Sequence, residues 1–278
     1  MEPAVAREHS GAIFYPLTLH TVGFLKETKD EDNRRSLAPC GSGVLSEIGG
    51  IKGAITAAHV ILELQKSPVA GLLTITNSKS KSRPLEFRTT ELEVASILGS
   101  DPPNGPDLGF VRFPHEIEQR LIAENAFYNF DVRLAGAMID DGTPLHCEVI
   151  SGIVAEKSEQ KAMTETTRID THTMVHAFGT ATNFRKGAKG YDLFEFEVQH
   201  NEQVSRPRSY GGMSGSAVWK TGDTTAANDR LVFGIAFYES DPDNDGRRVI
   251  TCHGPGCIYR ELVELVRDRF GNVFKIPN

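Results

Sequence analysis

A serine flanked by glycines precedes an apolar stretch, where residues 211–219 read GGMSGSAVW. Gly212 and Gly215 lack a Cβ, so this segment can turn sharply and point backbone N–H groups at a bound oxyanion. A serine hydroxyl is a weak nucleophile until a base takes its proton, and histidine is the side chain that titrates near neutral pH. Ser214 is therefore the candidate nucleophile, provided that the chain also supplies a histidine.

Two upstream segments supply a candidate base and a candidate acid. Residues 55–60 read ITAAHV and carry His59 at the end of an apolar stretch. Residues 105–111 read GPDLGFV and place Asp107 at the head of another. His59 would accept the Ser214 proton and later deliver it to the leaving amine. The carboxylate of Asp107 would hold the His59 tautomer and stabilise the imidazolium.

Asp101 is a rival for the role of the acid. It lies in residues 100–105, SDPPNG, a composition typical of an exposed turn. Asp107 instead directly precedes the apolar strand expected over residues 108–113, which would anchor its carboxylate. We therefore expect Asp107 to be the acid.

The three motifs, in the chain order His, Asp, Ser, resemble those of the trypsin/chymotrypsin-like serine proteases. Residues 41–45, GSGVL, match a further piece of that family's pattern. The resemblance implies an all-β, chymotrypsin-like fold: two antiparallel six-stranded β-barrels with the site in the cleft between them, and a C-terminal helix. It also implies a serine endopeptidase that acts through an acyl-enzyme intermediate.

The expected domains follow from this fold. The candidate histidine and aspartate fall in an N-terminal barrel, residues 1–118, and the candidate serine falls in a C-terminal barrel, residues 119–278. Alternating apolar positions predict a first strand over residues 12–25. Apolar residues on one face predict a helix over residues 114–125, and an amphipathic pattern predicts the C-terminal helix over residues 261–270.

The oxyanion hole and the substrate pocket are expected beside the nucleophile. The backbone N–H groups of Gly212 and Ser214 would form the hole, and one such donor contributes about 3 kcal/mol in the transition state. Arg208, ahead of the nucleophile, would favour an acidic substrate side chain by charge pairing. Glu239, on the strand after it, would favour a basic one. Pairing of the two residues with each other, or exposure of both, are alternatives.

Two departures from the secreted relatives bear on regulation and compartment. Met213 stands where those relatives have the Asp that pairs with a new N-terminus, so activation by cleavage is not expected. In this respect the chain is more similar to bacterial-type stand-alone and HtrA-like members. Val60 follows His59 where the secreted relatives have a cysteine, which leaves Cys40 without that partner. Together with an N-terminus that lacks a signal-peptide pattern, this predicts a cytoplasmic protein.

The composition and net charge limit the classes of partner that the chain is expected to bind. The chain has 278 residues with 24% charged and 39% hydrophobic residues, which is ordinary for a globular protein. The net charge of −7 does not favour nucleic-acid binding, and no apolar run is long enough to span a bilayer. We expect a protein or peptide substrate, no cofactor, no nucleic acid and no membrane. Narrow specificity or a regulatory protein partner would restrain such a protease.

Two segments resemble parts of metal sites. Cys252, His253 and Cys257 form half of a zinc-site pattern without an evident second half. Residues 241–246, DPDNDG, match the first half of a calcium loop, but Cys252 stands where the bidentate acid is expected. Acidic turns of this kind are common, so we predict no metal site.

Other functions fit the same residues less well. A pseudoprotease, which keeps the fold as a binding module, usually lacks a triad member, whereas all three are present here. A non-proteolytic acyl hydrolase would use identical nucleophile chemistry. An α/β-hydrolase fits poorly, because Ser216 replaces the final glycine of its motif and its histidine would come last in the chain.

Overall fold

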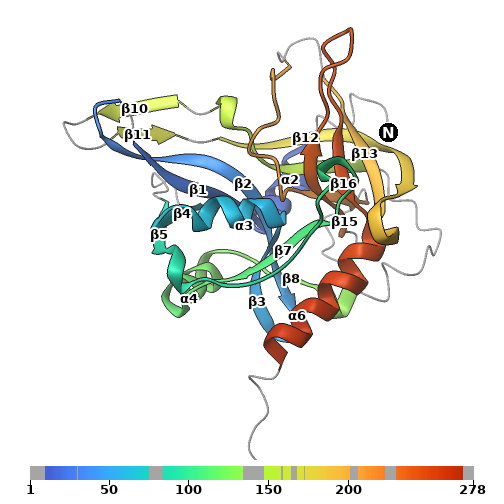
Figure 1. Ribbon diagram of the computed structural model, residues 1–278, viewed down its shortest axis with the longest axis horizontal. Helices are drawn as coiled ribbons and strands as arrows, with labels where there is room; N and C mark the ends of the chain where they lie inside the picture. The colour runs from blue at the N-terminus through green and yellow to red at the C-terminus, as the bar shows by residue number, and fades with distance from the viewer. Residues whose placement is uncertain are drawn as a thin grey trace, which may run out of the picture.

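The fold consists of an N-terminal β-sheet, a C-terminal β-barrel and a few helices at their margins (Figure 1). This arrangement comes from a computed structural model of the full chain. The structure describes residues 10–29, 31–74, 84–133, 147–157, 159–163, 168–171, 173–200, 206–222 and 230–271.

The N-terminal sheet follows the path β5-β4-β1-β2-β3-β7-β6, with every neighbouring pair antiparallel. A short eighth strand, β8, pairs in parallel with β2. No pairing joins the edge strands β5 and β6 in the part of the chain that the structure describes. The strands are β1 (Thr21–Lys29), β2 (Arg35–Ile48), β3 (Ile51–Thr56), β4 (Val69–Leu73), β5 (Leu85–Arg88), β6 (Glu93–Leu98), β7 (Asp107–Arg112) and β8 (Tyr128–Asn129).

The C-terminal sheet closes into a six-stranded antiparallel barrel in the order β12-β13-β16-β15-β14-β9. The predicted C-terminal barrel is thereby confirmed, as is the predominance of β-structure. Its strands are β9 (Cys147–Ile153), β12 (Met174–Lys186), β13 (Asp192–Val198), β14 (Ala217–Thr221), β15 (Arg230–Glu239) and β16 (Ile250–His253).

A separate two-stranded ribbon, β10 (Glu159–Met163) with β11 (Arg168–Thr171), extends from the barrel. It lies alongside β1 and β2 of the N-terminal sheet, and β11 contacts β2 (Figure 1). Single turns of 3₁₀-helix join other elements: η1 (Thr89–Glu91), η2 (Pro102–Asn104), η3 (Ala155–Lys157) and η4 (Ala188–Gly190).

The helices are peripheral and short. They are α2 (Ser10–Thr18), α3 (Ala58–Gln65), α4 (His115–Glu124) and α6 (Val263–Phe270), and a π-helical segment, η6 (Cys257–Leu262), leads directly into α6. The predictions of helices near residues 114–125 and 261–270 are confirmed. The predicted strand over residues 12–25 is wrong at its start, because α2 occupies its first half. Ile13 and Leu17, four residues apart, form the buried face of this helix.

Both ends of the described chain cross to the opposite half of the fold. From α2, Phe14 packs on Phe178 of β12, with ring centroids 5.1 Å apart. From α6, Phe270 packs on Phe110 of β7 with a centroid distance of 6.1 Å, and Arg267 forms an ion pair with Asp131. These contacts join the sheet and the barrel, and so stabilise the interface between them.

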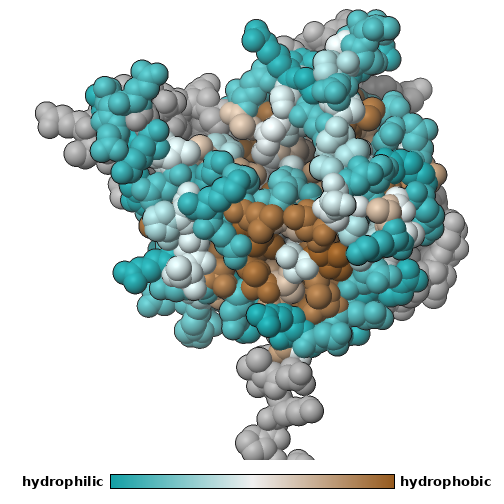
Figure 2. Space-filling model, in the orientation of Figure 1, coloured by the Kyte–Doolittle hydropathy of each residue, from teal (hydrophilic) through white to brown (hydrophobic). Residues whose placement is uncertain are grey.

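The buried apolar side chains of the described residues form four clusters, one mainly inside each half and two, one large and one small, between the halves. The larger cluster between the halves includes Trp219 of β14, Tyr128 of β8 and Phe130, with Tyr128 and Trp219 centroids 5.5 Å apart. On the face shown in Figure 2, apolar surface gathers between α3 and α6 and is framed by hydrophilic residues. No helix in the described ranges has the length and apolar character that crossing a membrane requires.

Candidate active site

His59 and Asp107 lie side by side and form two hydrogen bonds. The His59 ring Nδ1 lies 2.6 Å from Asp107 Oδ2, and the His59 backbone N–H donates to Asp107 Oδ1 at 3.0 Å. Because an ionised carboxylate only accepts hydrogen bonds, we assign the ring proton to Nδ1. The lone pair on Nε2 is then available to accept a proton.

The elements around this pair determine its orientation. His59 is the second residue of α3, whose apolar residues Val60, Ile61 and Leu64 are buried in the N-terminal core. Asp107 is the first residue of β7, opposite Leu98 on β6, and only 6% of its surface is exposed. The carboxylate is therefore buried, whereas 38% of the His59 side chain is exposed and can meet a substrate.

Asp101, the rival acid, lies in the turn before β7. It is exposed, and its Oδ2 accepts a hydrogen bond from the Asn104 side chain at 2.7 Å. The structure therefore brings Asp107, and not Asp101, to His59.

Ser214 lies in the loop that leads into β14. The two glycines of this loop have positive φ angles, 93° at Gly212 and 87° at Gly215. A Cβ on Gly215 would lie 2.0 Å from the Ser42 carbonyl oxygen and 2.2 Å from Thr56 Oγ1. The loop is thus packed directly on the end of β3, which leads into His59.

Ser42, a fully buried residue of β2, connects this loop to both halves of the fold. Its backbone N–H donates to the Ser214 carbonyl at 2.7 Å, and its hydroxyl donates to the Gly212 carbonyl at 2.7 Å. The same hydroxyl accepts the Ile153 N–H of β9 at 2.8 Å. The Ser42 carbonyl accepts the Thr56 hydroxyl at 2.7 Å. Sequence analysis included Ser42 only within a motif and missed this role.

The peptide groups around Ser214 leave two N–H groups without an acceptor in the part of the chain that the structure describes. The Gly211 carbonyl accepts the Ala155 N–H at 2.8 Å, and the Met213 carbonyl accepts the Ser216 N–H at 2.8 Å. Because the C=O and N–H of a trans peptide point in opposite directions, the N–H groups of Gly212 and Ser214 point away from these partners. Among the described residues neither N–H donates a hydrogen bond. Both are therefore available to an oxyanion.

The nucleophile and the base are not joined in this structure. Ser214 and His59 are both described, and no hydrogen bond links the Ser214 hydroxyl to the His59 ring. Such bonds are often long without substrate and shorten in the complex, so the missing bond does not exclude His59 as the base.

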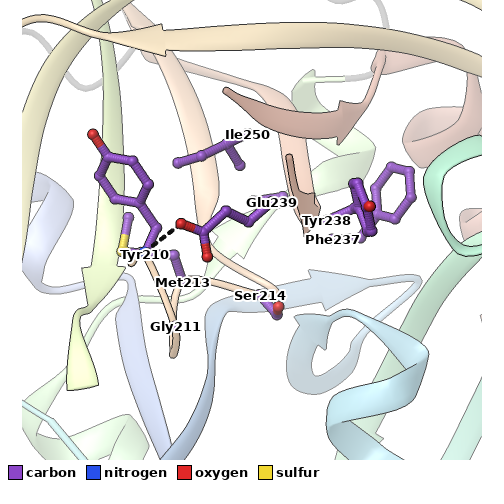
Figure 3. A pocket seen from close by; sticks show the side chains of 9 residues that line it. Tyr210, Gly211, Met213, Ser214, Phe237, Tyr238, Glu239 and Ile250 are labelled. Carbon is purple, nitrogen blue, oxygen red and sulfur yellow. Dashed lines mark hydrogen bonds between the residues drawn. The ribbon is translucent and has the colours of Figure 1, made fainter. Parts of the chain in front are cut away.

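A pocket opens beside Ser214, between the nucleophile loop and the strands β15 and β16 (Figure 3). Its empty volume, including the open mouth, is about 270 Å³. Its walls are mostly apolar or aromatic, with one carboxylate. The lining residues are Tyr210, Gly211, Met213, Ser214, Ala236, Phe237, Tyr238, Glu239 and Ile250.

Glu239 is the carboxylate of this pocket, and its oxygens already have partners. Oε2 accepts the Ser209 hydroxyl at 2.8 Å. Oε1 accepts the Tyr210 N–H at 2.8 Å, the bond drawn as a dashed line in Figure 3. Oε1 also lies 3.5 Å from Nε of Arg248. Burial, followed by the Glu239 charge, raises the pKa of Tyr210 to about 12. The Glu239 carboxylate in the pocket wall is therefore already hydrogen-bonded and paired with a cation.

Arg208 does not line the pocket. It is exposed, and its backbone N–H donates to Glu156 Oε2 at 2.7 Å. The cation that pairs with Glu239 is Arg248, which sequence analysis did not consider.

The segments that resembled metal sites have other hydrogen-bond partners. Cys257 Sγ donates to Asp192 Oδ1 at 2.6 Å, and Cys252 is fully buried. In the acidic loop, Asp243 Oδ1 accepts the backbone N–H groups of Asp245 at 2.9 Å and Arg247 at 2.7 Å. Within the described ranges, no group of three or more His, Cys, Asp or Glu side chains is placed to hold a metal ion.

Comparison with known proteins adds little to this geometry. No family model matches the sequence, and no curated protein matches it. Among 311 matching chains of solved structures, one is described as "Aromatic interactions drive the coupled folding and binding of the intrinsically disordered Sesbania mosaic virus VPg protein". The identity is 13% and the TM-score is 0.44, over 88% of this chain and 90% of that one. So weak a likeness says nothing about function, which must be inferred from the site.

Proposed function

We propose that the protein is a serine endopeptidase with Ser214 as nucleophile, His59 as base and Asp107 as the acid that orients the base. The observation that carries the proposal is the His59–Asp107 pair, with Nδ1 and Oδ2 2.6 Å apart. That contact fixes the ring tautomer that leaves Nε2 free as a proton acceptor. The unused N–H groups of Gly212 and Ser214 support it independently.

The proposed reaction has two stages. The Ser214 oxygen attacks the carbonyl carbon of the substrate peptide while its proton passes to His59 Nε2, and the N–H groups of Gly212 and Ser214 stabilise the oxyanion. The imidazolium then protonates the leaving amine, and the C–N bond breaks to leave an acyl-enzyme. Water, deprotonated by His59, hydrolyses the ester and restores the free Ser214 hydroxyl.

The chymotrypsin-like arrangement of two six-stranded barrels belongs to the same proposal. The closed C-terminal barrel supports it, as does the position of the nucleophile loop between that barrel and the N-terminal sheet. In this arrangement the N-terminal sheet would take the place of the first barrel, although among the described residues it has eight strands and its edge strands β5 and β6 are not paired.

A reducing, cytoplasmic location is also proposed. Cys40, Cys252 and Cys257 are thiols in the structure. Burial raises the pKa of Cys40 to about 12, which makes it unreactive. A protease in this compartment requires restraint, and narrow specificity or a regulatory protein partner would supply it.

The second candidate is a protein-binding module on the same fold that performs no chemistry. One observation favours it: no hydrogen bond joins the Ser214 hydroxyl to His59, both of which are described. If this separation persisted with substrate bound, Ser214 would not be activated.

Cleavage of a peptide library decides between the two candidates. Wild type and Ser214→Ala are incubated with peptides from a denatured proteome, and new termini are identified by mass spectrometry. New termini with wild type alone support the endopeptidase. An ester substrate run in parallel identifies an acyl hydrolase, which would cleave the ester and leave every peptide intact. Binding of peptides by both variants without cleavage would favour the binding module.

A further inference from the structure

His253, the last residue of β16, lies directly behind the candidate acid. Its ring is 0% exposed, and its Nε2 accepts the backbone N–H of Asp107 at 2.9 Å. β16 lies between β13 and β15, opposite Leu193 and Ile235, so the backbone of His253 is held on both sides. A histidine of the C-terminal barrel is thus bonded to the first residue of a strand in the N-terminal sheet.

The imidazole ring of His253 is held tightly. It stacks on Phe237, a pocket residue, with centroids 4.3 Å apart and planes 19° apart. Tyr191 meets it edge-on at 6.1 Å. On the remaining side, a Cβ on Gly105 would lie 2.7 Å from the ring carbon Cε1. The ring therefore has no space to rotate away from the Asp107 amide.

Accepting this hydrogen bond requires a lone pair on Nε2, so the ring of His253 is neutral with its proton on Nδ1. Burial is the main cause that lowers the pKa of His253, to about 4, although the nearby charges of Asp107 and Asp192 act in the opposite direction. Tyr191 is the other titratable group against the ring. Near neutral pH, His253 is therefore an acceptor that does not compete with His59 for protons.

We propose that His253 is a positioning residue, which fixes the backbone of Asp107 so that its carboxylate faces the Nδ1 and backbone N–H of His59. The role rests on the proposed function, since it acts on the acid of that triad. The proposal requires a hydrogen-bond acceptor at this position, one that accepts the Asp107 N–H. The contact of His253 with Phe237 also packs the region of Asp107 against the pocket wall.

Two substitutions separate acceptor chemistry from packing. His253→Phe keeps an aromatic ring for the stack on Phe237 but removes the acceptor. His253→Gln supplies a side-chain oxygen as acceptor without the ring. The matched control is His176→Phe, which replaces a half-buried histidine of the C-terminal barrel, hydrogen-bonded to Ser151 and Thr18 instead of Asp107.

The readout is the low-field proton resonance of the His59 Nδ1–Asp107 hydrogen bond, recorded in the Ser214→Ala background. It requires no catalysis, so it tests His253 even if the protein proves not to be a protease. We expect the resonance in the parent, in His176→Phe and in His253→Gln, and its loss in His253→Phe. An unchanged resonance in a folded His253→Phe would overturn the proposal. If His253→Phe does not fold, His253→Gln decides: a retained resonance supports acceptor chemistry, and a lost one overturns it.

Kinetics give a second readout in the protein with Ser214 intact. Misplacement of a catalytic group by about 1 Å costs about 10²-fold in rate. We therefore expect His253→Phe to lower kcat about 10²-fold with little change in KM, and His253→Gln to recover most of the loss. A change confined to KM would mean that His253 serves the pocket through Phe237, and would contradict the role at Asp107.

Discussion

Removal of one buried hydroxyl, in Ser42→Ala, tests how the nucleophile loop is held. The hydroxyl donates to the Gly212 carbonyl at 2.7 Å and accepts the Ile153 N–H at 2.8 Å. Without it, the buried Ile153 N–H loses its acceptor, which costs about 1–3 kcal/mol, and the bond to Gly212 contributes about 1 kcal/mol more. We therefore expect the free energy of unfolding to fall by about 3 kcal/mol.

The matched control is Ser46→Ala, four residues further along β2. Ser46 is also 0% exposed, but its hydroxyl donates to the Val44 carbonyl at 2.9 Å, within β2 and not to the nucleophile loop. Its loss should lower the free energy of unfolding by about 1 kcal/mol. Urea unfolding can be followed by the fluorescence of Trp219, the single tryptophan, which is fully buried.

The same pair of variants tests function. Ser42 holds the Gly212 carbonyl, next to one of the two N–H groups assigned to the oxyanion hole, and loss of one such donor costs about 10²–10³-fold in kcat. Because Ser42→Ala loosens the donor without removing it, we expect the peptidase rate to fall by at least about tenfold. Ser46→Ala should keep the wild-type rate. Equal stability and equal rate in the two variants would refute the reasoning about the loop.

Three further predictions concern the loop, the pocket and pH. Gly215→Ala should prevent folding or reduce the yield severely, whereas Gly246→Ala, with open space around its Cβ, should cost about 1 kcal/mol; comparable urea midpoints would contradict this. In matched peptides, lysine at the cleaved position should give no higher kcat/KM than leucine, because the carboxylate of Glu239 is already occupied; a large preference for lysine would show otherwise. Burial lowers the pKa of His20 and His176 to about 4 from 6.5, so the unfolded chain binds more protons between these values. The free energy of unfolding should be highest above pH 6.5 and fall by up to about 3 kcal/mol per histidine as the pH drops to 4. A urea midpoint that does not vary over this range would contradict this prediction.

Local patterns predicted those parts of the fold that depend on neighbours in the sequence. The helix expected over residues 114–125 is α4, and the helix expected over residues 261–270 is α6 with η6 before it. The first strand was predicted wrongly because residues 12–18 are rich in apolar side chains. The four-residue spacing of Ile13 and Leu17 is the signal of a helix that could have corrected it.

In the site, too, the residues within local motifs could be predicted, and those that depend on distant contacts could not. His59 and Asp107 could be predicted to meet because His59 follows one apolar strand, and Asp107 begins another, each within a characteristic motif. The roles of Ser42 and His253 could not, because they depend on contacts across the fold: His253 is 146 residues from Asp107, and the Ser42 hydroxyl reaches Gly212 over 170 residues. Such pairings arise only when the sheet and the barrel pack together.

The central claim, that the neighbours of Ser214 activate it, is tested most directly by the intact mass of the protein after treatment with a fluorophosphonate probe. Wild type and Ser214→Ala are labelled side by side, after circular dichroism shows that both are folded. The account predicts one adduct on wild type and none on Ser214→Ala. A folded wild type that forms no adduct, or an adduct that persists on Ser214→Ala, would contradict it.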